Sequence, residues 1–135
     1  MSLYVDSSAL LKRYVDETDS DACERQLAAD TTWVSGRHGY VEIHRNLARL
    51  LAEDALLAAQ SDFENDWKRF AVIEIDEVVC ERSANIAKAT GARTLDALHL
   101  GAASRLGGPS AVAMLTYDVR LAIIARQLGY HVLGI

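Results

Sequence analysis

The sequence predicts an α/β fold, specifically a three-layer α/β/α sandwich with a mainly parallel sheet. Short apolar runs alternate along the chain with longer segments in which apolar residues recur at helical spacing. The runs are continuously apolar, as in strands that are buried on both faces of a parallel sheet. The 135 residues, half of them hydrophobic and without a linker or repeat, are expected to form one domain over 1–135.

The N-terminal half predicts two strands and four helices. In order, they are a strand at 2–5, a helix after Asp6, a helix at 19–29, a strand at 33–35, and helices at 36–52 and 55–69. Thr18 or Ser20 is the expected N-cap of the helix at 19–29, because a side-chain hydroxyl can bind the free N–H groups of a first turn.

The C-terminal half predicts three further strands separated by three helices. The strands are placed at 70–75, 111–115 and 130–133, and the helices at 76–90, 94–107 and 119–128. Asp76 and Thr94 are the expected N-caps of the first two helices. Gly91 and Gly129 are placed to end helices in the left-handed conformation that glycine adopts easily.

Three acidic residues are predicted to meet at one edge of the sheet. Ligands of an open parallel sheet bind beyond the carboxyl ends of its strands. Asp6 follows the first strand directly, and Asp118 follows the fourth. Asp96 lies in a helical first turn, where N–H groups and the helix dipole favour negative charge. Alone, Asp6 fits a helix cap as well as a ligand, whereas Asp96 alone favours a first-turn role and Asp118 alone a capping role. Other acids, Asp66 among them, are expected at helix surfaces or caps.

Glu42 lies in the middle of a predicted helix and has two interpretations. At 100° per residue it shares a stripe with His38, Arg45 and Arg49, opposite the apolar face. Periodicity alone favours a solvated face with an ion-paired glutamate. The functional alternative places this stripe at the mouth of a cleft, where Glu42 reaches a metal ion and Arg45 or Arg49 reaches phosphate.

Clustered carboxylates require a cation. Two unit charges ~4 Å apart repel by roughly 4 kcal/mol at an effective dielectric of about 20. Mg²⁺ is commonly held by a few carboxylates together with water and substrate phosphates. Cys23 and Cys80 have no partner at metal-ligand spacing, so zinc is disfavoured, Mg²⁺ or Mn²⁺ is expected, and both thiols are expected to be reduced and buried.

The charge and hydropathy patterns restrict the partners. A formal charge of −5 argues against a nucleic-acid substrate, but without the four candidate acids the charge would be −1. A nucleic-acid substrate is therefore permitted without being indicated. No run approaches the ~20 apolar residues of a membrane span, and the N-terminus lacks signal-peptide features, so a cytoplasmic protein without membrane contact is expected.

Four stretches of the chain carry a family resemblance. They are Tyr4 to Leu10, Glu42 to Arg49, Arg93 to His99, and Thr116 to Asp118 with Leu121 and Gly129 behind it. In this order they resemble the PIN-domain family, and within it the VapC-type toxins of bacterial toxin–antitoxin pairs. The resemblance covers essentially the whole chain, although no single stretch is specific.

The resemblance implies metal-dependent endonucleolytic cleavage of RNA. The catalytic acids would be Asp6, Glu42, Asp96 and Asp118, with the metal held mainly by the three aspartates and with Glu42 furthest from it. Ser8 and Thr116 correspond to hydroxyl residues that support the acids. Recognition of the RNA would come from loop and helix-end arginines, namely Arg13, Arg37, Arg45, Arg93 and Arg120.

The resemblance further implies a homodimer and an inhibitory VapB-type antitoxin. The helical hairpin at 36–69 carries Leu50, Leu51, Leu56 and Leu57, which together offer more apolar surface than one narrow seam uses. His99 lies three residues after Asp96 and therefore on its side of the helix. A packing role is favoured for His99 over a supporting role at the acids.

Two other classes of function are weighed against the nuclease. A phosphotransfer module would use Asp6 as a covalent nucleophile and a late lysine near the acids, but the lysines are Lys12, Lys68 and Lys88. A non-catalytic RNA-binding or protein-binding module would gain nothing from four retained acids. Neither GxGxxG nor GxxxxGK[ST] occurs, which argues against a nucleotide-dependent enzyme.

Overall fold

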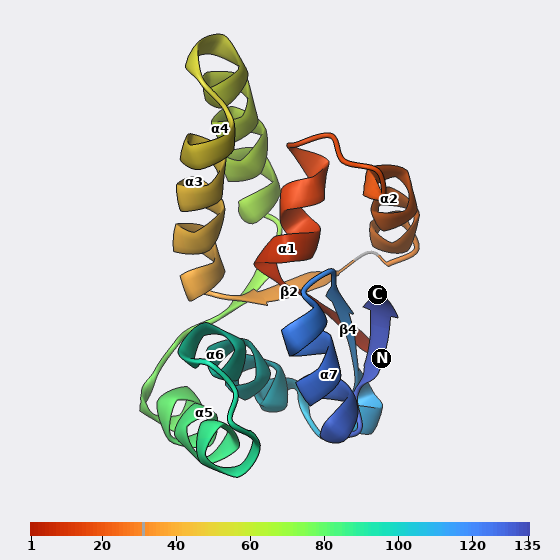
Figure 1. The fold of residues 1–135 in the computed structure, drawn as a ribbon, viewed down its shortest axis with the longest axis vertical. Coiled ribbons are helices and arrows are strands. Elements are labelled where there is room, and N and C mark those ends of the chain that lie inside the picture. Colours follow the sequence, from red (N-terminus) through yellow and green to blue (C-terminus); the bar gives the residue numbers. More distant parts are fainter. Residues whose placement is uncertain (31) are drawn as a thin grey trace.

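The computed structural model describes residues 1–30 and 32–135, which contain one five-stranded sheet (Figure 1). The strands are β1 (Ser2–Val5), β2 (Trp33–Gly36), β3 (Ala71–Ile73), β4 (Val112–Thr116) and β5 (His131–Gly134). Their order is β3-β2-β1-β4-β5, and every neighbouring pair is parallel. The predicted parallel sheet is confirmed, with β1 at its centre.

Seven α-helices in the described residues cover the two faces of the sheet. They are α1 (Ser7–Leu10), α2 (Ser20–Ala28), α3 (His38–Leu50), α4 (Glu53–Trp67), α5 (Glu77–Thr90), α6 (Thr94–Ala103) and α7 (Val119–Gln127). Figure 1 shows α1 to α4 on one side of the sheet and α5 to α7 on the other. The three-layer α/β/α architecture is therefore confirmed. None of the helices described is long and apolar enough to cross a membrane.

Two apolar cores hold these layers together, one on each face. Leu3 and Val5 of β1 belong to the core that contains Phe63 of α4, whereas Tyr4 belongs to the core that contains Leu100 of α6. The alternation follows from the pleat, because successive strand residues point to opposite faces. Every residue of β4 is buried, as expected for a strand covered on both sides.

The structure corrects the predicted N-cap residues of two helices, α2 and α6. Asp19, not Thr18 or Ser20, is the N-cap residue of α2, and the hydroxyl of Ser20 instead accepts the N–H of Glu17 at 2.9 Å. Arg93 precedes α6 as its N-cap, and Thr94 is its first helical residue.

The predicted strand at 70–75 and helix at 94–107 are both shorter in the structure. β3 contains three residues because it is an edge strand whose register pairs it only with residues 34–36 of β2. The helix at 94–107 ends as α6 at Ala103 and continues as a 3₁₀ turn over Ser104–Leu106. Gly91 and Gly129 have φ values of 75° and 91°, which confirms the left-handed positions predicted for them.

Two side chains lie in surroundings that the sequence did not indicate. Cys80 is exposed on α5, so the expectation that both thiols are buried holds only for Cys23. Asp66, expected at a helix surface, is 6% exposed at the end of α4. Its carboxylate accepts hydrogen bonds from Arg13 (3.0 Å), Tyr14 (2.6 Å) and Arg69 (2.7 Å). It therefore joins α4 to the segment that follows α1.

Replacing Asp66 with alanine is expected to lower the free energy of unfolding by about 1–3 kcal/mol, because the partly buried Arg13 and Tyr14 lose their acceptor. Burial acts to raise the pKa of Asp66, but the hydrogen bonds from Tyr14, Arg69 and Arg13 outweigh it and lower the pKa. A lowered carboxyl pKa stabilises the fold at neutral pH, and this contribution disappears as the pH falls through the folded-state pKa.

Urea unfolding of Asp66→Ala and of Asp62→Ala, an exposed acid on the same helix, measures the effect against a matched control. The difference in unfolding free energy between the wild type and Asp66→Ala should decrease as the pH falls below about 4, the usual pKa of an aspartate. Equal destabilisation by the two variants would contradict this assignment of Asp66.

Candidate active site

The acids that follow β1 and β4 are neighbours because these strands pair at the centre of the sheet. Asp6 follows β1, and its backbone N–H donates to the carbonyl of Leu115 in β4 at 3.2 Å. The hydroxyl of Thr116 donates to Oδ2 of Asp6 at 2.9 Å and accepts the backbone N–H of Asp118 at 3.0 Å. One hydroxyl therefore connects two of the predicted acids.

Asp6 is a buried carboxylate held by several donors. The residue is 3% exposed and is the N-cap of α1. Besides Thr116, the hydroxyl of Ser8 (2.7 Å) and the N–H of Ala9 (3.1 Å) donate to its Oδ1. Burial raises the pKa of Asp6, although these bonds and nearby His99 favour the ionised form. Ser8 and Thr116 both contact the acid that they were expected to support.

Asp96 and Asp118 line a common cleft. Asp96 lies in the first turn of α6, and Asp118 is the N-cap of α7, where it accepts the N–H of Arg120 at 2.9 Å. Burial raises the pKa of Asp96, and the negative charge of Asp118 raises it further. The cleft has a volume of about 320 Å³ and is lined by Glu42, Arg93, Thr94, Leu95, Asp96 and Asp118.

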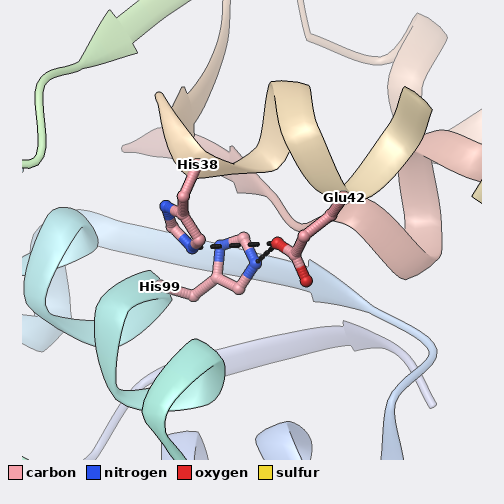
Figure 2. A group of neighbouring side chains, drawn as sticks. All are labelled: His38, Glu42 and His99. Carbon is pink, nitrogen blue, oxygen red and sulfur yellow. Dashed lines mark hydrogen bonds and ion pairs between the residues drawn. The ribbon is translucent and has the colours of Figure 1, made fainter. Parts of the chain in front are cut away.

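Glu42 is fixed by a buried chain of hydrogen bonds from β1 and β2. The N–H of Gly36 donates to the hydroxyl of Tyr4 at 3.0 Å, and this hydroxyl bonds to Nδ1 of His99 at 2.7 Å. Nε2 of His99 in turn bonds to Oε1 of Glu42 at 2.7 Å (Figure 2). When His99 is neutral with its proton on Nε2, Tyr4 donates to Nδ1 and Nε2 donates to Glu42; when His99 is protonated, both of its ring nitrogens donate.

The charges of His99 and Glu42 stabilise each other. Burial alone would raise the pKa of Glu42, but the hydrogen bond and charge of His99 outweigh it and lower the pKa. Burial alone would lower the pKa of His99, but Glu42, Asp6 and Asp96 together raise it. His99 is therefore surrounded by three of the four predicted acids.

The roles of Tyr4 and His99 in this chain of hydrogen bonds, and of His38 beside it, were not predicted from the sequence. The packing role favoured for His99 is contradicted by its contact with Glu42, and its three-residue spacing from Asp96 was the signal that pointed the other way. Tyr4 was read only as part of an apolar strand. His38 was assigned to the Glu42 stripe, but its proximity to His99, with ring centroids 4.1 Å apart, depends on the packing of α3 against α6.

Replacing Tyr4 with phenylalanine is expected to lower the free energy of unfolding by about 1–3 kcal/mol, because Gly36 N–H and His99 Nδ1 would lose a buried partner. Tyr130→Phe is the matched control, since Tyr130 is also buried but takes no part in this chain of bonds. Chemical unfolding of both variants measures the difference. If both variants lost a similar, small amount of unfolding free energy, the Tyr4 hydroxyl would contribute little to the stability of the fold.

The predicted arginines have different surroundings. Arg93 lines the acid cleft, and with Arg120 it also lines an adjoining pocket of about 330 Å³ beside Asp96. Arg45 is exposed on α3 and is absent from the lining of both, so its contact with RNA remains a prediction. Arg13 pairs with Asp66 and Glu24, and Arg37 pairs with Glu74, so both guanidinium groups are already engaged.

The acids fit a hard divalent cation by their chemistry. All their donor atoms are carboxylate oxygens, and the pKa of both Asp6 and Asp96 is raised by burial, so their negative charge is only partly offset. Among the described residues, the group that brings three ligand atoms within 4.8 Å is His38, Glu42 and His99, not the aspartates. The aspartates therefore fit such an ion by the chemistry of their oxygens, the ligand type that Mg²⁺ prefers.

A central parallel sheet with helices on both faces, carrying acids at its carboxyl edge, defines the class of protein. Residues 3–127 match the PIN domain family, and the chain belongs to this family. Within it, the chain is 30% identical to Ribonuclease VapC45 of Mycobacterium tuberculosis over 135 residues, covering 96% of this chain and 93% of the relative.

Solved structures share the fold at lower sequence identity. Mycobacterium tuberculosis VapC20, described as a Sarcin-Ricin loop cleaving toxin, superposes with a TM-score of 0.73 at 15% identity, covering 90% of this chain and 94% of that one. A toxin–antitoxin complex from Klebsiella pneumoniae has a chain with a TM-score of 0.66 at 15% identity, covering 89% and 88%. These likenesses support the predicted PIN-like, VapC-type architecture.

Proposed function

We propose that this protein is a metal-dependent endoribonuclease and the toxin of a type II toxin–antitoxin pair. The observation that carries the proposal is a cleft lined by three of the four predicted acids, with the fourth held nearby at the end of the central strand. Glu42, Asp96 and Asp118 line one cleft, and Asp6 is joined to Asp118 through Thr116. The similarity to a ribonuclease, VapC45, over nearly the whole chain supports the same activity.

Asp6, Asp96 and Asp118 are the proposed metal ligands. Mg²⁺ or Mn²⁺ is the proposed cation, because hard cations prefer oxygen donors. When bound, such a cation would lower the pKa of an attacking water and neutralise charge on the scissile phosphate. Ser8 and Thr116 orient Asp6 by direct hydrogen bonds.

Glu42 has a different proposed task from the aspartates. Its Oε1 is engaged by His99, while the residue also lines the cleft, so its ionised carboxylate is positioned to accept a hydrogen bond from the attacking water. Arg93 and Arg120, at the edge of the same acids, are proposed to bind RNA phosphates. Arg45 is a weaker proposal, because it is exposed one turn further along α3.

The surroundings of Asp6 disfavour the phosphotransfer alternative. Such a module needs a lysine close to the nucleophilic acid. Lys12, the lysine nearest to Asp6 in sequence, is paired with Glu17 and Asp19. A non-catalytic binding module remains the second alternative, and it predicts binding of RNA without new RNA ends.

A VapB-type antitoxin and a second copy of the chain are the proposed protein partners. A toxin–antitoxin complex among the solved structures of the same fold supports an antitoxin. Leu50 and Leu57 are 43% and 65% exposed on the α3–α4 hairpin, which projects beyond the sheet in Figure 1 and offers apolar surface for such contacts. Leu51 and Leu56, by contrast, pack against the core.

The proposed function is tested by mapping RNA ends after brief induction of the protein in bacterial cells. The wild type is expected to stop growth and to create new ends at a small set of RNA positions. Asp6→Asn is the control, because asparagine keeps the shape of the side chain and removes the charge. New ends that persist with Asp6→Asn, or growth arrest without new ends, would contradict the proposal.

A further inference from the structure

We propose that His38, Glu42 and His99 form a binding site for a zinc-type divalent cation, beside the oxygen-rich site proposed for Mg²⁺. Figure 2 shows the three side chains pointing toward one another, two from the first turns of α3 and one from α6. One ligand atom of each lies within 4.8 Å of the others. Oε1 of Glu42 is 3.8 Å from Nε2 of His38 and 2.7 Å from Nε2 of His99.

These separations are close to those of a metal site. Ligand atoms ~2.1 Å from a tetrahedral ion are about 3.4 Å apart. The distance from Glu42 to His38 exceeds this value, and the distance from Glu42 to His99 falls short of it. Side-chain rotations of the order of 1 Å would therefore complete the site.

His38 supplies the independent sign of a missing ligand. Both of its ring nitrogens are buried and lack a hydrogen bond of good geometry in the part of the chain that the structure describes, although the backbone of Leu95 lies close enough to favour the protonated ring. Its Nδ1 edge packs on Gly36, where a Cβ atom would come within 2.7 Å of that nitrogen. Nε2 is consequently the nitrogen left to face Glu42. Burial, with the nearby charge of His99, lowers the pKa of His38 to about 4, so at neutral pH the ring is neutral and one of its nitrogens carries a free lone pair.

His99 can become a ligand without losing its buried partner. In the structure its Nε2 proton points to Glu42, and a cation would take the place of that proton. The proton then resides on Nδ1, where the hydroxyl oxygen of Tyr4 accepts it. The hydroxyl hydrogen of Tyr4 then turns away from His99. A second hydrogen bond of this kind is the usual support for a metal-bound histidine.

The ligand set determines the class of ion. Two imidazole nitrogens and one carboxylate oxygen, with one position left open, form a ligand set used by Zn²⁺, and Co²⁺ binds similar sites. Mg²⁺ prefers oxygen ligands and does not compete effectively for imidazole. The assignment is independent of ribonuclease activity. If the proposed function is correct, however, the two sites share Glu42, and a zinc-type ion would withdraw it from the acids.

The test is a titration of the purified full-length protein with Co²⁺ in excess Mg²⁺, followed by visible absorption. One equivalent of Co²⁺ should give the absorption bands of imidazole ligation, and Zn²⁺ should remove them. His38→Asn should weaken Co²⁺ binding more than about 100-fold, because loss of an outer partner alone typically costs 10–100-fold. His44→Asn, a histidine of the same helix paired with Glu64, should bind like the wild type.

Asp96→Asn separates this site from the oxygen site, and it should retain Co²⁺ binding. The proposal is overturned if His38→Asn binds Co²⁺ as tightly as the wild type, or if Asp96→Asn loses binding to the same extent. A measurement on the wild type needs no variant: Zn²⁺ should shift the ¹⁵N resonances of the His38 and His99 rings. Unchanged ring resonances at saturating Zn²⁺ would also overturn the assignment.

Discussion

RNA cleavage by Asp96→Asn is expected to fall at least about 1,000-fold, while the fold is preserved. Loss of a metal ligand removes several kcal/mol of transition-state stabilisation, and each 1.36 kcal/mol corresponds to a factor of ten in rate. The unfolding midpoint should stay the same or rise. Burial and the charge of Asp118 raise the pKa of Asp96, so ionised Asp96 costs stability at neutral pH and asparagine removes that cost.

Asp76→Asn is the matched control for this prediction. Asp76 is also an aspartate at a helix N-terminus, where it accepts the N–H of Val79 at 2.9 Å, but it lies outside the acid cleft. Cleavage of a labelled RNA is measured for both variants under identical conditions, together with thermal unfolding. Asp96 would be excluded from the active site if Asp96→Asn cleaved RNA at the wild-type rate. The same conclusion would follow if the variant were unfolded under the assay conditions, because unfolding would then explain its loss of cleavage.

Removal of divalent metal is expected to abolish cleavage. The four acids carry negative charge that the described side chains offset only in part, so without a cation they would repel a phosphate. EDTA should reduce cleavage to background, and excess Mg²⁺ or Mn²⁺ should restore it. Cleavage that continues in EDTA after dialysis would exclude metal from the mechanism.

Thermal unfolding gives a reading of metal binding that is independent of RNA. A ligand that binds the folded state at 100 times its Kd stabilises the fold by about 2.7 kcal/mol. Mn²⁺ should therefore raise the unfolding temperature of the wild type, and much less that of Asp96→Asn. An equal rise in both proteins would place the ion away from Asp96.

Topology explains why much of the site could be predicted from the sequence. The carboxyl ends of parallel strands meet at one edge of a sheet, so Asp6 and Asp118 are placed together once β1 and β4 are recognised. Asp96 follows from the capped first turn of a helix, although its N-cap was misplaced by one residue. Glu42 could be selected only by family resemblance, because its helical stripe fits a solvated face equally well.

The histidines and Tyr4 could not be predicted in the same way. Their roles depend on contacts across 32 to 95 residues of sequence, and no local period records such contacts. A tyrosine within an apolar strand is read as core, and a histidine within an apolar helix as packing. Asp66 was misread for the same reason, since two of its partners lie 52 and 53 residues away.

The central claim, that the aspartates hold the cation at which RNA is cut, is tested most directly by anomalous diffraction from crystals soaked in Mn²⁺. A preparation that cleaves RNA should show an anomalous peak bounded by the carboxylates of Asp6, Asp96 and Asp118, and this peak should be absent from Asp96→Asn. A peak confined to another part of the molecule, or none at saturating Mn²⁺, would contradict the proposed active site.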